Sequence, residues 1–266
     1  EYLKPFNLAH HDSGSIASKV AAIKEWLTES SFKVVGEYSP FAGTHIIVVT
    51  NDQLKANATK STNGGFGAAV RIAITKVGAH IQISYSNPSY MAHSYRMKDK
   101  LKGVEDELKQ LLDHVDSYGS KDGFEGWELE EWNYMFAQPY FDDPIEIGYG
   151  DHSGVIKVVE AGLAAKKGGV SQVFKINIDA RQTLFGVAFS SGDGADKVVM
   201  NALDLNRLKH SAHLPYGLLV IDGKILFLHG KYSIASSFPD MPMGDFMSVS
   251  DAPDAMVEAL EKVVHH

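Results

Sequence analysis

The chain carries two copies of one short pattern, and this repeat limits its fold more than any other feature. The sequence HDSGS occupies residues 11–15, and DHSGV occupies residues 151–155. A pattern that recurs after enough residues to build a core predicts a duplicated domain. Any functional site is then expected in one copy or at the seam, the boundary between the two copies.

Hydrophobic periodicity repeats in the same order after each opening. A stretch of helical spacing is followed by two pairs of β-rich segments and then by a second helical stretch. Asp222-Gly223 is typical of a two-residue hairpin turn. The expected fold class is α+β, with two tandem strand–helix–four-strand–helix domains whose mainly antiparallel sheets are related by a pseudo-two-fold axis. The matching segments are 16–27 and 156–163, 32–49 and 170–189, 68–85 and 216–229, and 104–115 and 256–263.

The expected domains are a first repeat at 1–116, an aromatic-rich connecting segment at 117–143 and a second repeat at 144–266. The connecting segment places eight aromatic rings between residues 118 and 141. A flexible linker is poor in such residues, so we expect an ordered clamp buried against both domains. In the alternative interpretation, some of these rings line a ligand pocket at the seam.

Composition narrows the classes of function. The net charge is −8 and no cluster of Lys and Arg interleaves with aromatic residues, so no nucleic-acid partner is expected. No apolar run approaches the roughly 18 residues of a membrane span. The absence of cysteine excludes disulfides, thiolate metal sites and a cysteine nucleophile.

The two ends of the chain bear on where the protein is located. A start at Glu1 fits an exported, periplasmic protein whose leader has been removed, and it fits equally a trimmed cytoplasmic sequence. The final pair His265-His266 resembles the remains of a purification tag, so neither histidine enters a candidate site.

Residues 79–92, AHIQISYSNPSYMA, resemble the strand-then-helix signature of the bacterial domain-of-unknown-function 302 family. The helix before Phe32-Lys33-Val34-Val35 also resembles the opening of that family, and the resemblance covers most of residues 14–97. In the second copy, only Lys231-Tyr232-Ser233 echoes the end of the signature strand.

The resemblance implies a strand, helix, four-strand, helix fold of the kind grouped with TATA-binding-protein-like folds, without DNA binding. It also implies that the family's usual pairing of domains is internal to this chain, which would then be a monomer with an internal pseudo-dimer, or a homodimer. The family has no settled activity, so the resemblance supplies no catalytic residues.

Two groups of residues are candidates for binding. Tyr85, Asn87 and Tyr90 of the signature, with Trp127 and Trp132 of the connecting segment, are the candidates for contact with a small molecule.

Histidine is the second candidate group, because neutral imidazole is a common ligand of zinc and copper. The chain has twelve histidines. His210 and His213 have the i, i+3 spacing that can converge on one ion, with His152 or His11 as the third donor. Soft donors lie nearby at Met241, Met243 and Met247. Non-covalent haem is a less favoured alternative.

A structural interpretation of these histidines stays open. Asp12, Ser13, Asp151 and Ser153 are the residue types that cap helices, so a neighbouring histidine can simply be exposed.

No nucleophile elbow, zinc-binding helix, Walker loop or dinucleotide fingerprint occurs in the sequence. The leading hypothesis is a non-enzymatic protein that holds a small ligand or metal near the seam. The alternative is an enzyme in which His152 and Asp151 carry out acid–base chemistry or metal-assisted hydrolysis.

Overall fold

The computed structural model describes residues 2–265. Glu1 and His266, which enter the leader and tag interpretations above, lie outside the described residues. None of the helices within 2–265 combines the length and the apolar composition needed to cross a membrane.

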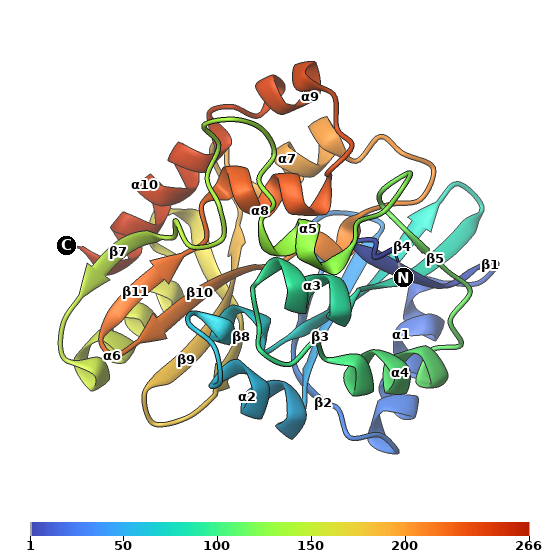
Figure 1. Ribbon diagram of the computed structural model, residues 1–266, viewed down its shortest axis with the longest axis horizontal. Helices are drawn as coiled ribbons and strands as arrows, with labels where there is room; N and C mark the ends of the chain where they lie inside the picture. Colours follow the sequence, from blue (N-terminus) through green and yellow to red (C-terminus); the bar gives the residue numbers. More distant parts are fainter. Residues whose placement is uncertain (1, 266) are drawn as a thin grey trace.

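The strands of this part of the chain form one eleven-stranded antiparallel sheet (Figure 1). Its order is β6-β1-β5-β4-β3-β2-β8-β9-β10-β11-β7. The first half contributes β1 (Phe6–Asp12), β2 (Lys33–Tyr38), β3 (Thr44–Thr50), β4 (Val70–Val77), β5 (His80–Ser86) and β6 (Asp116–Tyr118). The second half contributes β7 (Ile145–Tyr149), β8 (Val170–Asn177), β9 (Gln182–Phe189), β10 (Tyr216–Ile221) and β11 (Lys224–Phe227).

The α+β class and the antiparallel pairing predicted from the sequence are confirmed. The two halves, however, do not have separate sheets. Their edge strands β2 and β8 pair with each other, with Gly36 opposite Phe174. Read inward from β1 and from β7, the strands follow the same order in both halves, and β6 adds one strand outside β1.

Each half of the sheet has an inner face, which faces the other half, and an outer face. Four long helices cover the outer faces. α1 (Ile16–Thr28) and α4 (Lys102–Leu111) pack on the first half, and α6 (His152–Ala164) and α10 (Ala252–Val264) pack on the second. The shorter helices are α2 (Asp52–Ala58), η1 (Gly64–Gly67), α3 (Pro88–Ser94), α5 (Gly126–Glu130), η2 (Lys167–Gly169), α7 (Asp196–Leu203), η3 (Ser211–His213), α8 (Gly230–Ser237) and α9 (Met243–Ser248).

The repeated HDSGS and DHSGV pattern begins a helix in each half. Ser15 caps α1 by accepting a hydrogen bond from the backbone N–H of Ser18 (3.1 Å). Asp151 caps α6 by accepting one from Gly154 (3.0 Å). These bonds satisfy N–H groups that a helix leaves unpaired in its first turn. Of the four residues expected to cap, Asp151 is the N-cap of its helix, whereas the first half is capped by Ser15 and Asp12 ends β1, so the caps come from different positions of the repeated pattern.

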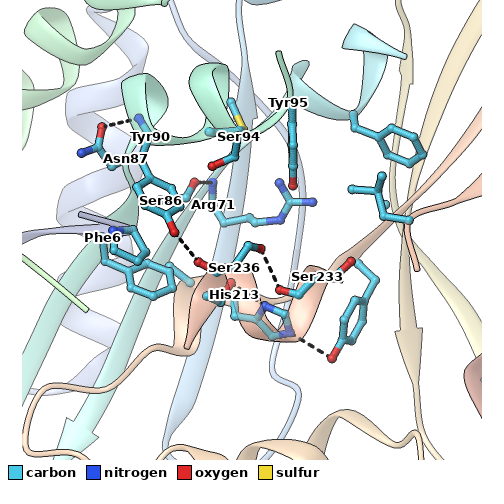
Figure 2. A pocket seen from close by; sticks show the side chains of 18 of the residues that line it. Phe6, Arg71, Ser86, Asn87, Tyr90, Ser94, Tyr95, His213, Ser233 and Ser236 are labelled. Atoms are coloured by element: carbon cyan, nitrogen blue, oxygen red, sulfur yellow. Dashed lines mark hydrogen bonds between the residues drawn. The ribbon is translucent and has the colours of Figure 1, made fainter. Parts of the chain in front are cut away.

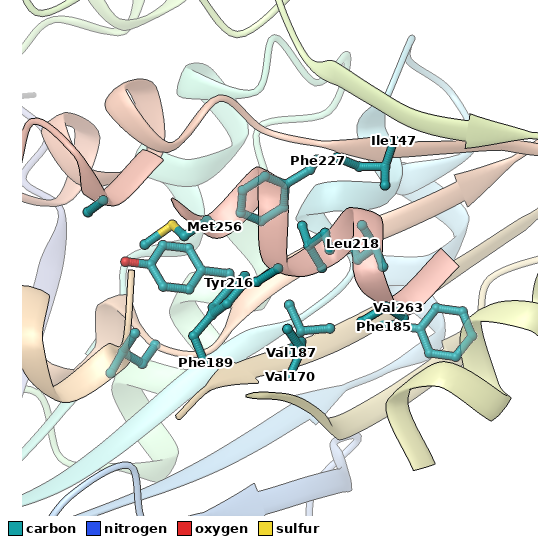
Figure 3. Packing of buried hydrophobic residues seen from close by; sticks show 14 of the residues in the cluster. Ile147, Val170, Phe185, Val187, Phe189, Tyr216, Leu218, Phe227, Met256 and Val263 are labelled. Carbon is teal, nitrogen blue, oxygen red and sulfur yellow. The ribbon is translucent and has the colours of Figure 1, made fainter. Parts of the chain in front are cut away.

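The core has three parts. One cluster lies between β3–β5 and the helices α1 and α4, and a second lies between β8–β11 and the helices α6 and α10 (Figure 3). The third cluster is on the inner face, where the two halves of the sheet face each other. Its members come from both halves, including Phe6, Ile46, Val48, Phe66, Phe174, Leu184, Leu219 and Tyr232.

The aromatic connecting segment contacts both halves, as a clamp would. Phe124 packs edge-on against Tyr90 of the first half, and Trp132 packs in the same way against Tyr232 of the second. Its burial is less complete than the composition predicts. Trp127 on α5, Phe136 in a turn and Tyr140 in an irregular stretch are exposed, with 97% of Phe136 accessible.

Candidate functional site

The helices α3 and α8 meet at the inner face through two reciprocal hydrogen bonds. The hydroxyl of Tyr90 on α3 donates to the carbonyl oxygen of Ser236 on α8 (2.8 Å). The hydroxyl of Tyr232 on α8 donates to the carbonyl oxygen of Ser94 on α3 (2.7 Å). Both phenols are buried, so each bond satisfies a hydroxyl that has no access to water.

The two tyrosines hold the same position in their helices. Asn87 caps α3 and His229 caps α8, each through its own side chain, and the tyrosine is the third residue after the cap in both. Tyr232 therefore corresponds to Tyr90 of the helix. The sequence suggested that residues 231–233 echo the end of the signature strand. This is wrong, because these residues lie in α8, which follows the end of β11 at Phe227.

A cavity of about 80 Å³ lies between α3, α8, η3 and the start of β4 (Figure 2). We call it the seam cavity, because both halves line it. Its walls are mostly aromatic and aliphatic, with hydroxyl and amide groups between them. The principal lining residues are Phe6, Phe66, Arg71, Asn87, Tyr90, Met91, Ser94, Tyr95, His213, Tyr216, Ser233 and Ser236.

Among the described residues that line the cavity, Arg71 alone has a permanent charge, and it is only 8% exposed. It lies on β4, and its Nε donates to the backbone carbonyl of Pro215 in the other half (2.9 Å). Within residues 2–265, no group hydrogen-bonds or ion-pairs with its two terminal nitrogens. Figure 2 shows the side chain extending between α3 and α8.

In the part of the chain that the structure describes, no carboxylate compensates the charge of Arg71. The ionisable groups that affect its pKa are the phenols of Tyr95 and Tyr38, and burial lowers the pKa of Arg71 from its usual value. Burial also raises the pKa of Tyr95, so this phenol stays protonated at neutral pH. A guanidinium remains charged in proteins even when its pKa falls somewhat, so the site holds a buried cation without a counter-ion.

Two hydroxyl-bearing residues, Tyr95 and Ser94, line the seam cavity together with Arg71. The ring of Tyr95 stacks on Phe141 of the connecting segment (5.1 Å between centroids) and points toward Arg71. Ser94 also lines the cavity, and its buried Oγ has no hydrogen-bond partner. Unpartnered buried polar atoms are rare in folded proteins, and a bound molecule is one of their ordinary explanations.

His213 adds no second charge to the seam cavity. Its Nδ1 is hydrogen bonded to Ser237 Oγ (2.8 Å) and its Nε2 to the Tyr216 hydroxyl (2.9 Å). Burial, and next the positive charge of Arg71, lower the pKa of His213 to about 3. The imidazole is therefore neutral at physiological pH.

The five residues suggested for small-molecule contact are distributed unequally. Asn87 and Tyr90 line the seam cavity. Tyr85 lies in the core on the outer face of the first half. Trp132 packs against Tyr232 and outside the cavity lining, and Trp127 is 61% exposed.

Of the four histidines suggested for a metal, His210 and His213 lie close together, because both are hydrogen bonded to Ser237 and both rings pack against Phe238, whereas His11 and His152 lie elsewhere. Within residues 2–265, no group of three or more His, Cys, Asp or Glu is placed to hold a metal ion. His210 donates from Nδ1 to the carbonyl oxygen of Ser237 (2.8 Å), and burial lowers its pKa to about 4. The ring of His11 packs against that of His80 at 5.0 Å on the far side of the first half, and His152 begins α6 in the second. Zinc, copper or haem binding stays a prediction.

The pair suggested for acid–base catalysis has structural roles. The Asp151 carboxylate accepts hydrogen bonds from the backbone of Gly154 and the hydroxyl of Ser153. His152 Nδ1 accepts one from the backbone N–H of Gly223 (3.3 Å). Both side chains are therefore engaged at the start of α6.

Comparison with known proteins gives limited information. No family model matches the chain, and no curated protein matches it. A solved structure similar to part of it is that of an uncharacterized conserved protein, DUF302, from Bacillus stearothermophilus. It shares 16% identity and a TM-score of 0.37, over 41% of this chain and 95% of that chain. The name is that of the family whose signature residues 79–92 resemble. Nothing about function follows from the match.

Arg71 is the functional candidate that the motif search missed. The sequence did contain a signal for this residue: Arg71 is the single charged residue in the apolar run 68–74, AAVRIAI. A charged residue in a strand that reads as buried on both faces needs a partner. The identity of that partner, or its absence, depends on residues far away in the sequence.

Proposed function

We propose that the protein is a non-enzymatic binding protein that holds a small anion in the seam cavity. One observation carries the proposal: the terminal nitrogens of Arg71 face the cavity without a partner, although the residue is almost fully buried. A buried charge without a counter-ion is strongly unfavourable, and a guanidinium is a preferred donor to oxyanions. An anion at this position would supply the missing charge.

The placement of the cavity supports the same proposal. The hydrogen bonds of Tyr90 and Tyr232 hold α3 against α8, and the Nε of Arg71 is fixed by Pro215. The charged group is therefore held in place before any ligand arrives, which lowers the entropic cost of binding.

The proposal also extends the expected domain organisation. We propose that 1–116 and 144–266 are repeats joined by 117–143, and that the anion site exists only where the two repeats meet. The common strand order and the equivalent positions of Tyr90 and Tyr232 support this division.

Thermal unfolding with added anions tests the proposed function. For the parent protein, the melting temperature should rise with anion concentration, because a ligand at 100 times its Kd stabilises the folded state by about 2.7 kcal/mol. Arg71→Gln should abolish this rise. Arg207→Gln is the matched control, because Arg207 is exposed and lies outside the seam cavity. An equal rise in the parent and in Arg71→Gln would contradict the proposal.

A further inference from the structure

The seam cavity has features that select among anions, and this selection rests on the proposed function. Three properties of the cavity bear on it: the donors left free on Arg71, the total charge of the lining, and the volume. Each can be argued from the described residues.

The free donors form a fork. Because Nε of Arg71 is already bonded to the Pro215 carbonyl, the two terminal nitrogens are the ones that remain for a ligand. Two coplanar nitrogens of one guanidinium match the two oxygens of a carboxylate, and the geometry is that of a bidentate pair. A spherical ion such as chloride would use this fork less fully.

The charge of the lining favours a ligand with a single negative charge. Arg71 supplies one positive charge, none of the described lining residues is Lys, Asp or Glu, and His213 is neutral. A monoanion leaves the site neutral. A dianion such as sulfate would leave one negative charge buried and uncompensated, which costs several kcal/mol in a site of low dielectric.

The volume sets an upper limit on size. A cavity of about 80 Å³ has room for roughly five to eight water molecules. A ligand of about four to six non-hydrogen atoms fits that space. The apolar remainder of such a ligand would contact Phe6, Phe66 and Met91, which line the same cavity.

We infer that the seam cavity selects a short-chain monocarboxylate, with its carboxylate on the terminal nitrogens of Arg71 and its short apolar part against Phe6, Phe66 and Met91. Tyr95 and Ser94 line the same cavity; the Tyr95 ring points toward Arg71, and the buried Oγ of Ser94 has no partner among the described residues. The class includes acetate, propionate and lactate.

Isothermal titration of the intact chain, dialysed free of carboxylates, tests the class. The probes are acetate, propionate, lactate, chloride, sulfate, malonate and benzoate. The short monocarboxylates should bind at least tenfold more tightly than each of the other four. Arg71→Lys, which keeps the charge and loses the fork, should weaken propionate binding at least tenfold, and Arg71→Gln should weaken it further. Arg207→Gln should bind like the parent.

The outcomes separate the ligand class from the proposed function. Chloride, sulfate or malonate binding as tightly as propionate, with dependence on Arg71, would overturn the monocarboxylate class, and equally tight benzoate binding would overturn the limit to short chains; either result would leave an anion site. Propionate binding that is equal in the parent and both Arg71 variants would overturn the class and the site together.

Should the Arg71 variants fail to fold, Tyr95→Phe provides a second test. This variant keeps the stacking on Phe141 and removes the hydroxyl, and unchanged propionate affinity in it would overturn the assigned position.

Discussion

At the scale of single residues, His213 is a structural group as well as a wall of the seam cavity. Both of its ring nitrogens are hydrogen bonded in the buried interior, to Ser237 and Tyr216. His213→Ala should lower the free energy of unfolding by about 2–4 kcal/mol, because it leaves the buried hydroxyl of Tyr216 and the half-buried hydroxyl of Ser237 without this partner and opens a space. Urea unfolding at pH 7 measures this. His152→Ala, at a half-buried position with one 3.3 Å bond, should cost under about 1 kcal/mol and is the control.

The same histidine predicts a pH dependence. Its folded pKa of about 3 is depressed below the ordinary value of about 6.5, so its contribution is present above pH 6.5 and is lost as pH falls toward 3. Between pH 7 and pH 5, the parent should lose about 2 kcal/mol through this group. His213→Ala should lose correspondingly less over that range, and parallel curves for the two proteins would show that the imidazole is not buried neutral.

For Asp196 we expect the opposite dependence of stability on pH. Burial raises its folded pKa to about 7, although Tyr38 donates a hydrogen bond to its carboxyl group (3.0 Å). Its stabilising contribution is greatest below the ordinary pKa of about 3.9 and is lost as pH rises through 7. Relative to the parent, Asp196→Asn should therefore gain about 2–3 kcal/mol between pH 5 and pH 8, measured by urea unfolding. Asp193→Asn, at an exposed position nearby, should follow the parent at both pH values.

At the scale of elements, the joint between β2 and β8 depends on a glycine. A Cβ on Gly36 would lie 2.1 Å from the carbonyl oxygen of Val173 and 2.8 Å from the Cβ of Phe174. The backbones of the two strands can approach this closely only where the side chain is hydrogen. The two halves of the sheet therefore join at a position that requires glycine, and the sequence has glycine there.

Gly36→Val tests this joint. The variant should lose at least about 2 kcal/mol of stability, because the strands must separate or distort to admit the side chain. Gly244→Ala in α9 is the matched control, since a Cβ there meets no atom within 4 Å and alanine favours a helix. Thermal unfolding of both variants measures the effect, and equal melting temperatures would mean that the β2–β8 pairing contributes little.

At the scale of the whole molecule, the inner-face cluster couples the two halves. Phe66 of the first half and Leu219 of the second belong to one buried cluster, so separating the halves would expose apolar surface on both. The intact chain should unfold in a single calorimetric transition, with an enthalpy near 0.7 kcal/mol per residue. Residues 2–116 and 144–265 expressed separately should not unfold cooperatively. Two resolved transitions in the intact chain would contradict this coupling.

Local patterns were sufficient for most of the fold. The period at which hydrophobic residues recur shows which face of a helix or strand is buried, and this period can be recognised from a few neighbouring residues. The hairpin turn at Asp222-Gly223 is an example, with both residues at positive φ as a tight turn requires. Among the candidate ligand residues, Asn87 and Tyr90 line the seam cavity, and their contact with a ligand stays a prediction.

The sequence by itself determined the α+β class, the order of most elements and the antiparallel pairing of neighbouring strands such as β10 and β11, because each depends on residues close in the chain. Only the tertiary structure decided that β2 pairs with β8, that Tyr90 and Tyr232 bond reciprocally, and that Arg71 contacts Pro215 while its terminal nitrogens find no partner. A missing counter-charge is a property of everything that surrounds a group in space. No local pattern records it, because the surrounding residues come from both halves of the chain.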